Sequence, residues 1–211
     1  LAPGSTPLDL VDTKLVDVNG QTITSTAVDG AVQVTGTAPD VAVTSVDPFK
    51  TVVGKGYTCE INVSTENQGS YEVTYNVTTY ANNTPFVSAT ITVDAGSSRV
   101  VTLTWNTSLF AYGNYTLKCI ADTLPGEIDT SDNTYTSAKQ VHIGVPGDVS
   151  SSTPGVYDKI VNMKDVAYLV SLFNTRPSST NWNPNADIND DGVCNMKDIA
   201  TAVAYFNQRE S

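Results

Sequence analysis

Residues 187–198, DINDDGVCNMKD, carry oxygen-bearing side chains at a spacing that suits a metal ion. Counted along this segment, they fall at positions 1, 3, 5, 9 and 12: Asp187, Asn189, Asp191, Asn195 and Asp198. Gly192 supplies the sharp turn at position 6, and the Val193 carbonyl follows at position 7. Because calcium takes about six to eight oxygen ligands around such a turn, the segment predicts a calcium site rather than a plain acidic turn. The last position is Asp where the usual motif has Glu.

A second, similar segment lies upstream. Residues 162–165 repeat the sequence NMKD of residues 195–198 at a separation of 33 residues. Each copy leads into apolar residues at the i, i+3, i+4, i+7 spacing of a helix: Val166, Leu169, Val170 and Phe173, then Ile199, Ala202, Val203 and Phe206. The repeat therefore predicts two loop–helix units, each with an apolar stripe to bury against the other.

The first loop departs from the spacing of the second. It opens at Asp148 and closes at Asp165, which makes it six residues longer, and Lys159 stands where glycine is expected. Its oxygens still fit a second calcium ion if residues 151–157 bulge outward. The candidate ligands are Asp148, Ser150, Asp158, the Ile160 carbonyl, Asn162 and Asp165.

Residues 146–211 resemble a dockerin domain. The resemblance rests on GDV at 147–149, NMKD at 162–165, the connector WNPNAD at 182–187 and the second loop. It implies a calcium-dependent adaptor that docks onto a cohesin-type β domain. It also implies a pseudo-twofold docking surface, open to a partner in two orientations, that includes Met163, Lys164, Met196 and Lys197. The alternative is that the duplication only packs the two halves of the domain on each other.

The composition limits the classes of partner. The chain has 211 residues and a formal net charge of −11, and seven of its 22 acidic residues fall between Asp148 and Asp198. Such an acidic surface argues against nucleic acid and anionic membranes as partners. No run of about 20 apolar residues predicts membrane insertion. Because the sequence begins with Leu1, we interpret it as a mature product or a piece of a longer protein.

Residues 38–145 alternate apolar and polar positions in about six or seven short runs, which predicts an Ig-like β-sandwich. The expected inward positions run from Tyr57 to Val63, Tyr71 to Val77, Val87 to Val93, Val101 to Trp105 and Tyr115 to Ala121, with a last strand at 140–143. The predicted class is thus mainly β with a small α domain.

The cysteines suggest a covalent link across this sandwich. Cys59 and Cys119 fall on inward positions of the second and the penultimate predicted strands. The arrangement predicts a disulfide between the two sheets, with two reduced core thiols as the alternative. Cys194, at an apolar position of the second calcium loop, is expected to be a buried free thiol.

The same region resembles the CARDB type of extracellular β-sandwich. The resemblance rests on residues 39–43, 52–54, 66–69, 104–107 and 129–133. It implies a secreted or cell-surface spacer and adhesion module without catalysis. Together with the dockerin-like segment, it implies a prokaryotic surface protein of archaeal type.

Five Asn-x-Ser/Thr acceptors lie at expected outward strand positions or turns of the sandwich: Asn62, Asn76, Asn82, Asn106 and Asn114. Their placement permits covalent N-glycans on a secreted domain.

Residues 1–37 offer three short strands, with turn signals at Asn19-Gly20 and Asp29-Gly30. They hold too few apolar residues for a core of their own. We therefore expect them to complete the sandwich of their own chain or that of a neighbour.

Catalytic chemistry is poorly represented. The single histidine, His142, falls on a strand without a nucleophile beside it, which argues against Ser–His–Asp and zinc sites. We expect a non-catalytic extracellular protein, a subunit of a calcium-stabilised, glycosylated surface filament in which copies join head to tail. The alternative is the C-terminal docking part of a larger secreted enzyme that binds a cohesin-type scaffold.

Overall fold

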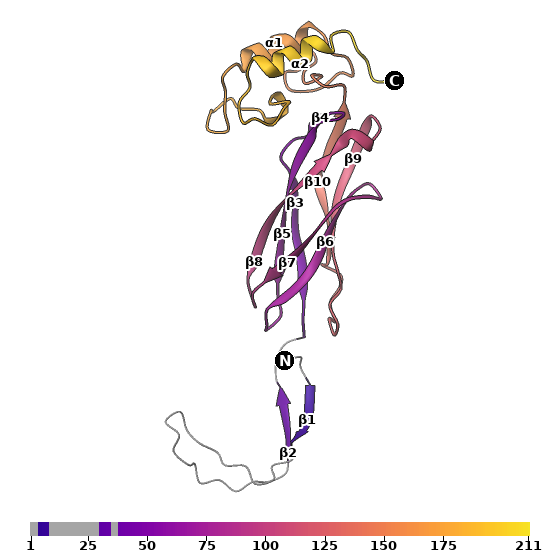
Figure 1. The fold of residues 1–211 in the computed structure, drawn as a ribbon, viewed down its shortest axis with the longest axis vertical. Coiled ribbons are helices and arrows are strands. Elements are labelled where there is room, and N and C mark those ends of the chain that lie inside the picture. Colours follow the sequence, from indigo (N-terminus) through magenta and orange to yellow (C-terminus); the bar gives the residue numbers. More distant parts are fainter. Residues whose placement is uncertain (1–3, 9–29, 35–37) are drawn as a thin grey trace.

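The computed structural model describes residues 4–8, 30–34 and 38–211. A strand pair, a two-sheet β-sandwich and a small helical domain follow one another along the chain (Figure 1). The structure is mainly β with few helices, as the sequence predicts.

The sandwich consists of a five-stranded and a three-stranded sheet. In spatial order, the larger sheet contains β4 (Val52–Gly54), β10 (Thr134–Gly144), β9 (Gly113–Ala121), β6 (Val73–Ala81) and β7 (Thr84–Val93). The smaller one contains β3 (Val41–Pro48), β5 (Thr58–Asn67) and β8 (Ser98–Asn106). All neighbouring strands are antiparallel except β4 and β10, which are parallel.

The predicted alternation produces the core between the sheets. Residues 59, 61 and 63 on β5 and 73, 75 and 77 on β6 are buried, while their neighbours along each strand are more exposed. Trp105, fully buried, packs its ring against Phe86, Phe110 and Tyr115. The inward positions expected on these strands are confirmed.

The chain crosses between the sheets immediately after β3. Pro48 ends β3, and residues 49–51 carry the chain from the smaller sheet to β4 in the larger one. The crossing places Lys50 at the end of the sandwich that carries the helical domain. The last strand, expected at 140–143, instead begins at Thr134, with an irregularity in its pairing between Thr136 and Gln140. The polar residues before Gln140 concealed this part of the strand.

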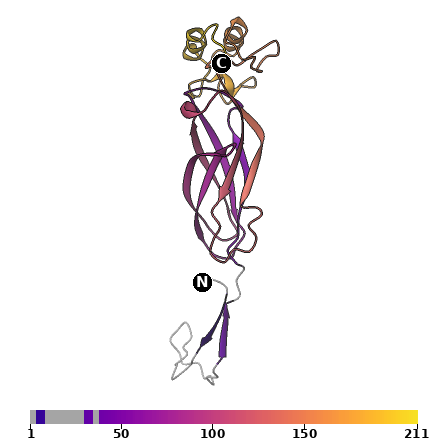
Figure 2. The same cartoon turned by 90° about the vertical axis from the view of Figure 1, so that its right-hand side faces the viewer.

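The C-terminal domain contains α1 (Met163–Ser171), the 3-10 turn η2 (Pro184–Ala186) and α2 (Met196–Ala204). It sits on one end of the sandwich and has its own apolar core (Figures 1 and 2). Gly147, with φ of 98°, lets the chain leave the sandwich close to α2, because a Cβ atom there would lie 2.6 Å from Ala202 Cα. No helix of the described residues is long and apolar enough to cross a membrane.

The apolar stripes of the two helices are only partly buried. Leu169, Ile199 and Ala202 belong to the domain core, but Val170, Phe173, Val203 and Phe206 are exposed. The prediction that both stripes are buried against each other is therefore wrong for these four residues. Two nine-residue helices that lie side by side bury one line of contact each, and the i+4 and i+7 positions turn outward.

At the other end of the sandwich, β1 (Gly4–Leu8) pairs antiparallel with β2 (Gly30–Val34). Within the described residues, these strands join no sheet of the sandwich. The expected turn at Asn19-Gly20 lies outside the described residues, as does Asp29 of the second turn.

The predicted disulfide between Cys59 and Cys119 is wrong, because both are free thiols. Cys59 pairs in register with Trp105, whose ring lies 5.6 Å from that of Tyr115 on β9. Cys119 lies four residues further along β9, or roughly 13 Å at about 3.3 Å per residue. A disulfide needs Cα atoms within about 7 Å. Both cysteines face the core, as predicted, but at different levels of it.

We therefore expect three free thiols per chain. Burial raises the pKa of Cys59 to about 11 and those of Cys119 and Cys194 to about 12, so the folded thiols stay protonated and react slowly. Protein denatured without reductant should titrate three thiols with a chromogenic disulfide reagent. Detection of a single thiol would contradict the structure and restore the disulfide.

Candidate metal centres of the C-terminal domain

The two loops of the C-terminal domain have the same backbone geometry. Lys159 and Gly192, 33 residues apart, both adopt a left-handed conformation, with φ of 68° and 79°. Lys159 thus makes the turn expected of glycine, in a region that residues with a side chain rarely occupy. Two residues later, Val161 and Cys194 are each fully buried.

Each loop is tied to the end of the opposite helix. Main-chain hydrogen bonds join Val161 to Asn207 and Gln208 after α2, at 2.8 and 3.1 Å. The equivalent bonds join Cys194 to Asn174 and Thr175 after α1, at 2.7 and 3.1 Å. This crosswise pairing fixes both loops against both helices, so the domain behaves as one unit.

Asn162 and Asn195 have a role that the ligand assignment overlooked. Each is the N-cap of its helix, with its side-chain Oδ1 accepting a hydrogen bond from the main-chain N–H of Lys164 or Lys197 at 2.8 Å. The Nδ2 atoms face the carbonyl oxygens of Ile160 and Val193, at 3.3 and 3.1 Å. The sequence NMKD is therefore also a capping box, with Asp three residues after Asn.

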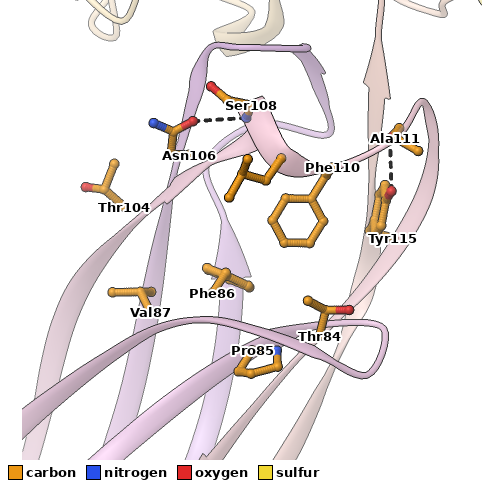
Figure 3. Close-up of a pocket in the computed structure, with 11 residues that line it drawn as sticks. Thr84, Pro85, Phe86, Val87, Thr104, Asn106, Ser108, Phe110, Ala111 and Tyr115 are labelled. Carbon is orange, nitrogen blue, oxygen red and sulfur yellow. Dashed lines mark hydrogen bonds between the residues drawn. The ribbon is translucent and has the colours of Figure 1, made fainter.

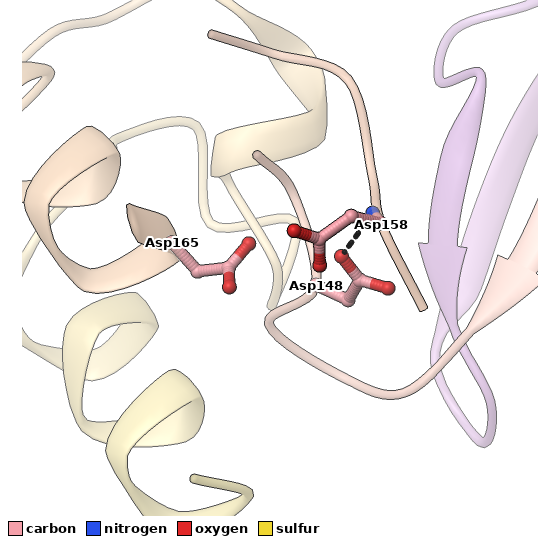
Figure 4. Close-up of side chains that lie close together, drawn as sticks. All are labelled: Asp148, Asp158 and Asp165. Atoms are coloured by element: carbon pink, nitrogen blue, oxygen red, sulfur yellow. Dashed lines mark hydrogen bonds between the residues drawn. The ribbon is translucent and has the colours of Figure 1, made fainter. Parts of the chain in front are cut away.

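The first loop brings together Asp148, Asp158 and Asp165, one carboxylate oxygen from each lying within 4.8 Å of the others (Figure 4). Asp165 accepts main-chain N–H bonds from Val149 and Ser150 at 2.8 Å. Asp148 Oδ1 accepts the N–H of Asp158 at 3.0 Å. Asp148 Oδ2 and Asp158 Oδ1 are buried without a hydrogen-bond partner. Two buried acceptor atoms in a three-carboxylate cluster fit a cation.

The second loop brings together Asp187, Asp191 and Asp198 at the same mutual limit of 4.8 Å. Asp187 accepts the N–H groups of Asp191 and Gly192 at 3.1 and 2.9 Å. Asp198 accepts those of Ile188 and Asn195, both at 2.8 Å. The loop is thus wrapped around its own carboxylates.

The neighbours of Asp191 complete the second loop. Asn189 donates from Nδ2 to Asp191 Oδ2 at 3.3 Å, and Asn195 Nδ2 lies 3.2 Å from both oxygens of Asp191. Lys197 Nζ lies 3.0 Å from Asp191 Oδ2, and the corresponding Lys164 lies 3.5 Å from Asp158 Oδ2. Of the predicted ligands, three carboxylates meet in each loop, whereas Lys164 and Lys197 turn toward the loops rather than toward a partner.

The donor set of both loops fits calcium. Carboxylate and carbonyl oxygens dominate, and the described parts of the two loops direct one sulfur atom, that of Cys194, at the carbonyl of Leu169 and not at a carboxylate. Hard oxygen ligands select Ca²⁺ or Mg²⁺ over softer metals, and flexible loops with several carboxylates favour the larger ion.

Burial without a cation raises the pKa of these acids. Desolvation raises the pKa of Asp148 to about 7, and repulsion from Asp165 and Asp158 adds to it. Desolvation also raises the pKa values of Asp165 and Asp187. The carboxylates therefore resist ionisation until a positive charge joins them.

A matched set of apolar side chains covers the outer side of the helices. Met163 and Met196 are 63% and 61% exposed, and Val170 and Val203 are 54% and 55% exposed. Phe173 and Phe206 are 51% and 39% exposed. We call these six residues the helix face. Its members are related in pairs by the 33-residue repeat, and Lys164 and Lys197 stand beside its methionines.

The sandwich contacts the second loop through a buried lysine. Lys50 is 2% exposed, and its Nζ donates to the main-chain oxygen of Asp187 and lies 2.6 Å from Asp190 Oδ1. Asn185 Oδ1 accepts the N–H groups of Thr51 and Val52 at 2.9 and 3.1 Å. This interface holds the loop in place from outside.

His142 contacts the first loop and the end of the chain. Its ring stacks on that of Tyr157 at 3.6 Å, and its nitrogens face Asn114 Oδ1 at 2.7 Å and Glu210 Oε1 at 2.5 Å. Residues 151–157, expected to bulge out of the first loop, thus place an aromatic ring against the sandwich. His142 has a structural role, which agrees with the sequence analysis.

All five asparagines of the glycosylation motifs are exposed. Four lie on β5, β6, β8 and β9, and Asn82 lies in the turn between β6 and β7. The expected outward placement is confirmed, and glycosylation itself stays a prediction.

A groove of about 590 Å³ lies where the edge strands β7 and β8 diverge (Figure 3). Phe86, Phe110 and Tyr115 line it. Their rings pack on one another and on Trp105, so they belong to the edge of the core. The groove contains no titratable group besides Tyr115.

Residues 38–137 match the CARDB family profile, so the β-sandwich is a CARDB domain, as its sequence predicts. No curated protein matches the chain.

Solved structures resemble parts of the chain. A CARDB domain from Pyrococcus furiosus, determined in complex with di-metal ions, is 23% identical over 51% of this chain and 94% of its own, with a TM-score of 0.43. A domain named as part of a cell surface protein from Methanosarcina acetivorans is 25% identical over 50% and 91%, with a TM-score of 0.39. A chain of a type II cohesin–X-dockerin complex from Acetivibrio cellulolyticus is 17% identical over 64% and 83%, with a TM-score of 0.28.

Without calcium, we expect the C-terminal domain to become more stable as the pH falls from about 7 toward 4. The folded protein then takes up a proton on Asp148, whose pKa is raised from 3.8 to about 7, that the unfolded chain does not bind in this range. With calcium the trend should reverse, because protons compete with the ion for the carboxylates. Thermal melts across this range, with and without calcium, test the prediction.

The variant Asp148→Asn supplies the control for this experiment. It should weaken the pH trend in calcium-free buffer and reduce the stabilisation by calcium. If the wild-type melting temperature is independent of calcium at pH 8, the loops do not bind it.

Lys50→Met should destabilise the protein by about 3 kcal/mol, because it leaves the Asp190 carboxylate and the Asp187 carbonyl without their buried partner. Lys139→Met is the matched control. Lys139 makes an equally short ion pair with Asp47, at 2.6 Å, but both side chains are more than half exposed, so we expect a loss below about 1 kcal/mol. Urea unfolding of both variants measures the difference, and equal losses would show that the buried contact contributes nothing special.

Proposed function

We propose that the chain is a non-catalytic extracellular assembly protein, in which a CARDB sandwich carries a calcium-ordered docking domain at one end. The observation that carries this proposal is the helix face. Six large apolar side chains stay exposed on a domain of two short helices, although the same helices bury other apolar residues efficiently. Exposed apolar groups that gather on one surface mark interaction sites.

The orientation of the domain supports a docking role. The loops of the first and second repeats face the sandwich through Tyr157 and Lys50, so the interface consumes the loops and leaves the helices outward (Figure 1). The metal centres lie directly before α1 and α2, whose capping aspartates, Asp165 and Asp198, are also cluster members. Calcium would therefore order the surface that binds the partner.

The twofold arrangement favours a partner that binds in two orientations. Each residue of the helix face has an equivalent 33 residues away with similar exposure. A partner pocket that receives Phe173 in one orientation can receive Phe206 in the other. A cohesin-type β domain, which the dockerin resemblance implies, is the partner that we propose, with the chain's own copies as the second candidate.

The location and the glycans belong to the same proposal. The sandwich is of a cell-surface type by its family, and its five glycosylation motifs are all exposed. Glycans there would coat the sandwich and leave the helix face free.

Phe173→Ser and Phe206→Ser should each weaken binding of a cohesin-type domain by about twofold, because one of two equivalent orientations is lost. The double variant should weaken it by roughly a hundredfold, since neither orientation then buries a phenylalanine. Surface plasmon resonance against the cohesin-type domains of the same organism, in calcium, measures this. Phe49→Ser removes a similarly exposed phenylalanine from the sandwich and is the control, with affinity unchanged.

Sedimentation and electron microscopy of the calcium-loaded chain alone separate the two candidate partners. Growth of fibres that vanish on deletion of residues 1–37, or in Asp187→Ala and Asp198→Ala, would support head-to-tail assembly. A monomer that binds no cohesin-type domain would refute the proposal in both forms.

A further inference from the structure

The end of the sandwich opposite the helical domain holds a second concentration of acids. There the β9–β10 loop, residues 122–133, packs against the start of β3 (Figure 1). The N–H of Val43 donates to the Asp132 main-chain oxygen at 2.9 Å, and the N–H of Val41 donates to Glu127 Oε1 at 2.9 Å. These contacts bring Asp40, just before β3, into one corner with the acids of the loop.

The charges in this corner are not balanced by bases. Glu127, Asp129 and Asp132 all lie near enough to Asp40 to raise its pKa, after the larger effect of its burial. Among the described residues, the ion pairs involve none of these four carboxylates.

Two of the four acids are satisfied by hydrogen bonds. Glu127 accepts bonds on both oxygens, from Val41, Leu124 and the side chain of Asn133. Asp129 accepts the N–H and the hydroxyl of Ser131, at 3.0 and 2.6 Å.

Three other side-chain oxygens in the corner are buried without a partner: Asp40 Oδ1, Asp132 Oδ1 and Asn133 Oδ1. Asn133 is only 3% exposed, and its Nδ2 donates to Glu127 Oε2 at 3.1 Å. A rotated amide would set two acceptor oxygens against each other, so the bond to Glu127 fixes the orientation of the bare oxygen. Each unpaired buried acceptor costs about 1–3 kcal/mol.

We propose that Asp40, Asp132 and Asn133 form a binding site for a hard divalent cation, Ca²⁺, at this end of the sandwich. All three orphan atoms are acceptors, which a cation satisfies together and hydrogen-bond donors of the protein do not reach. A proton shared by Asp40 and Asp132 would leave the Asn133 oxygen unpaired. Main-chain oxygens and water complete the coordination that calcium needs.

Such an ion would fasten the β9–β10 loop to the residues that precede β3. It would lie at the opposite end of the sandwich from the C-terminal loops, and its argument is independent of them. Calcium would then order both ends of the sandwich.

Native mass spectrometry of the full chain at fixed free calcium tests the site by counting bound ions. The double variant Asp40→Asn, Asp132→Asn should bind one ion fewer than the wild type. Asp129→Asn, which removes a neighbouring charge whose oxygen is already bonded, is the control and should bind as many as the wild type. An equal count in the double variant and the wild type overturns the proposal.

Thermal melting separates metal binding from a merely structural role. In calcium-free buffer, the double variant should melt at or above the wild-type temperature, because repulsion between the two acids is removed. In calcium, only the wild type and the control should gain the full increase in melting temperature. A double variant that is destabilised equally in both buffers would show a structural role alone. If the C-terminal loops bind no calcium, the wild type would bind one ion and the double variant none, so the two proposals fail separately.

Discussion

The burial of carboxylates in the two C-terminal loops is the constraint on which the rest of this domain depends. Asp148, Asp165, Asp187 and Asp198 are all nearly inaccessible to solvent, and ionised groups in such places need compensation. Main-chain N–H groups of the loops provide part of it. The loops therefore curl around their acids, and the same aspartates that gather at the centres start the helices. Loop shape, helix position and outer surface are consequences of one electrostatic requirement.

The sandwich takes part in meeting this requirement. Lys50 places a buried ammonium group against the second loop, where it also counteracts the rise in the pKa of Asp187. His142 and Tyr157 join the first loop to the sandwich by stacked rings. The metal centres thus lie between the sandwich and the helices, and a change at the centres would reach the helix face through very few bonds.

The duplicated domain is symmetric where it faces outward and asymmetric where it faces the sandwich. The helix face repeats pair by pair, whereas the first loop alone contains the insertion with Tyr157 and the second alone receives Lys50. This division is what a docking module needs when it is fixed to one neighbour and offers two equivalent surfaces to another.

The sequence by itself determined the β-sandwich and its inward positions, because period-two alternation in a strand directly reports which side is buried. It also determined the two loops, since ligand spacing and the repeated NMKD are local features. It did not determine which apolar helix residues stay exposed, because helical spacing marks a stripe without revealing how much of it a neighbour covers. The level of Cys59 relative to Cys119, the reach of Lys50 into the second loop and the meeting of Asp40 with Asp132 were decided only by tertiary structure. Each depends on how far strands are staggered and where loops cross, and these are set by packing between residues distant in the chain.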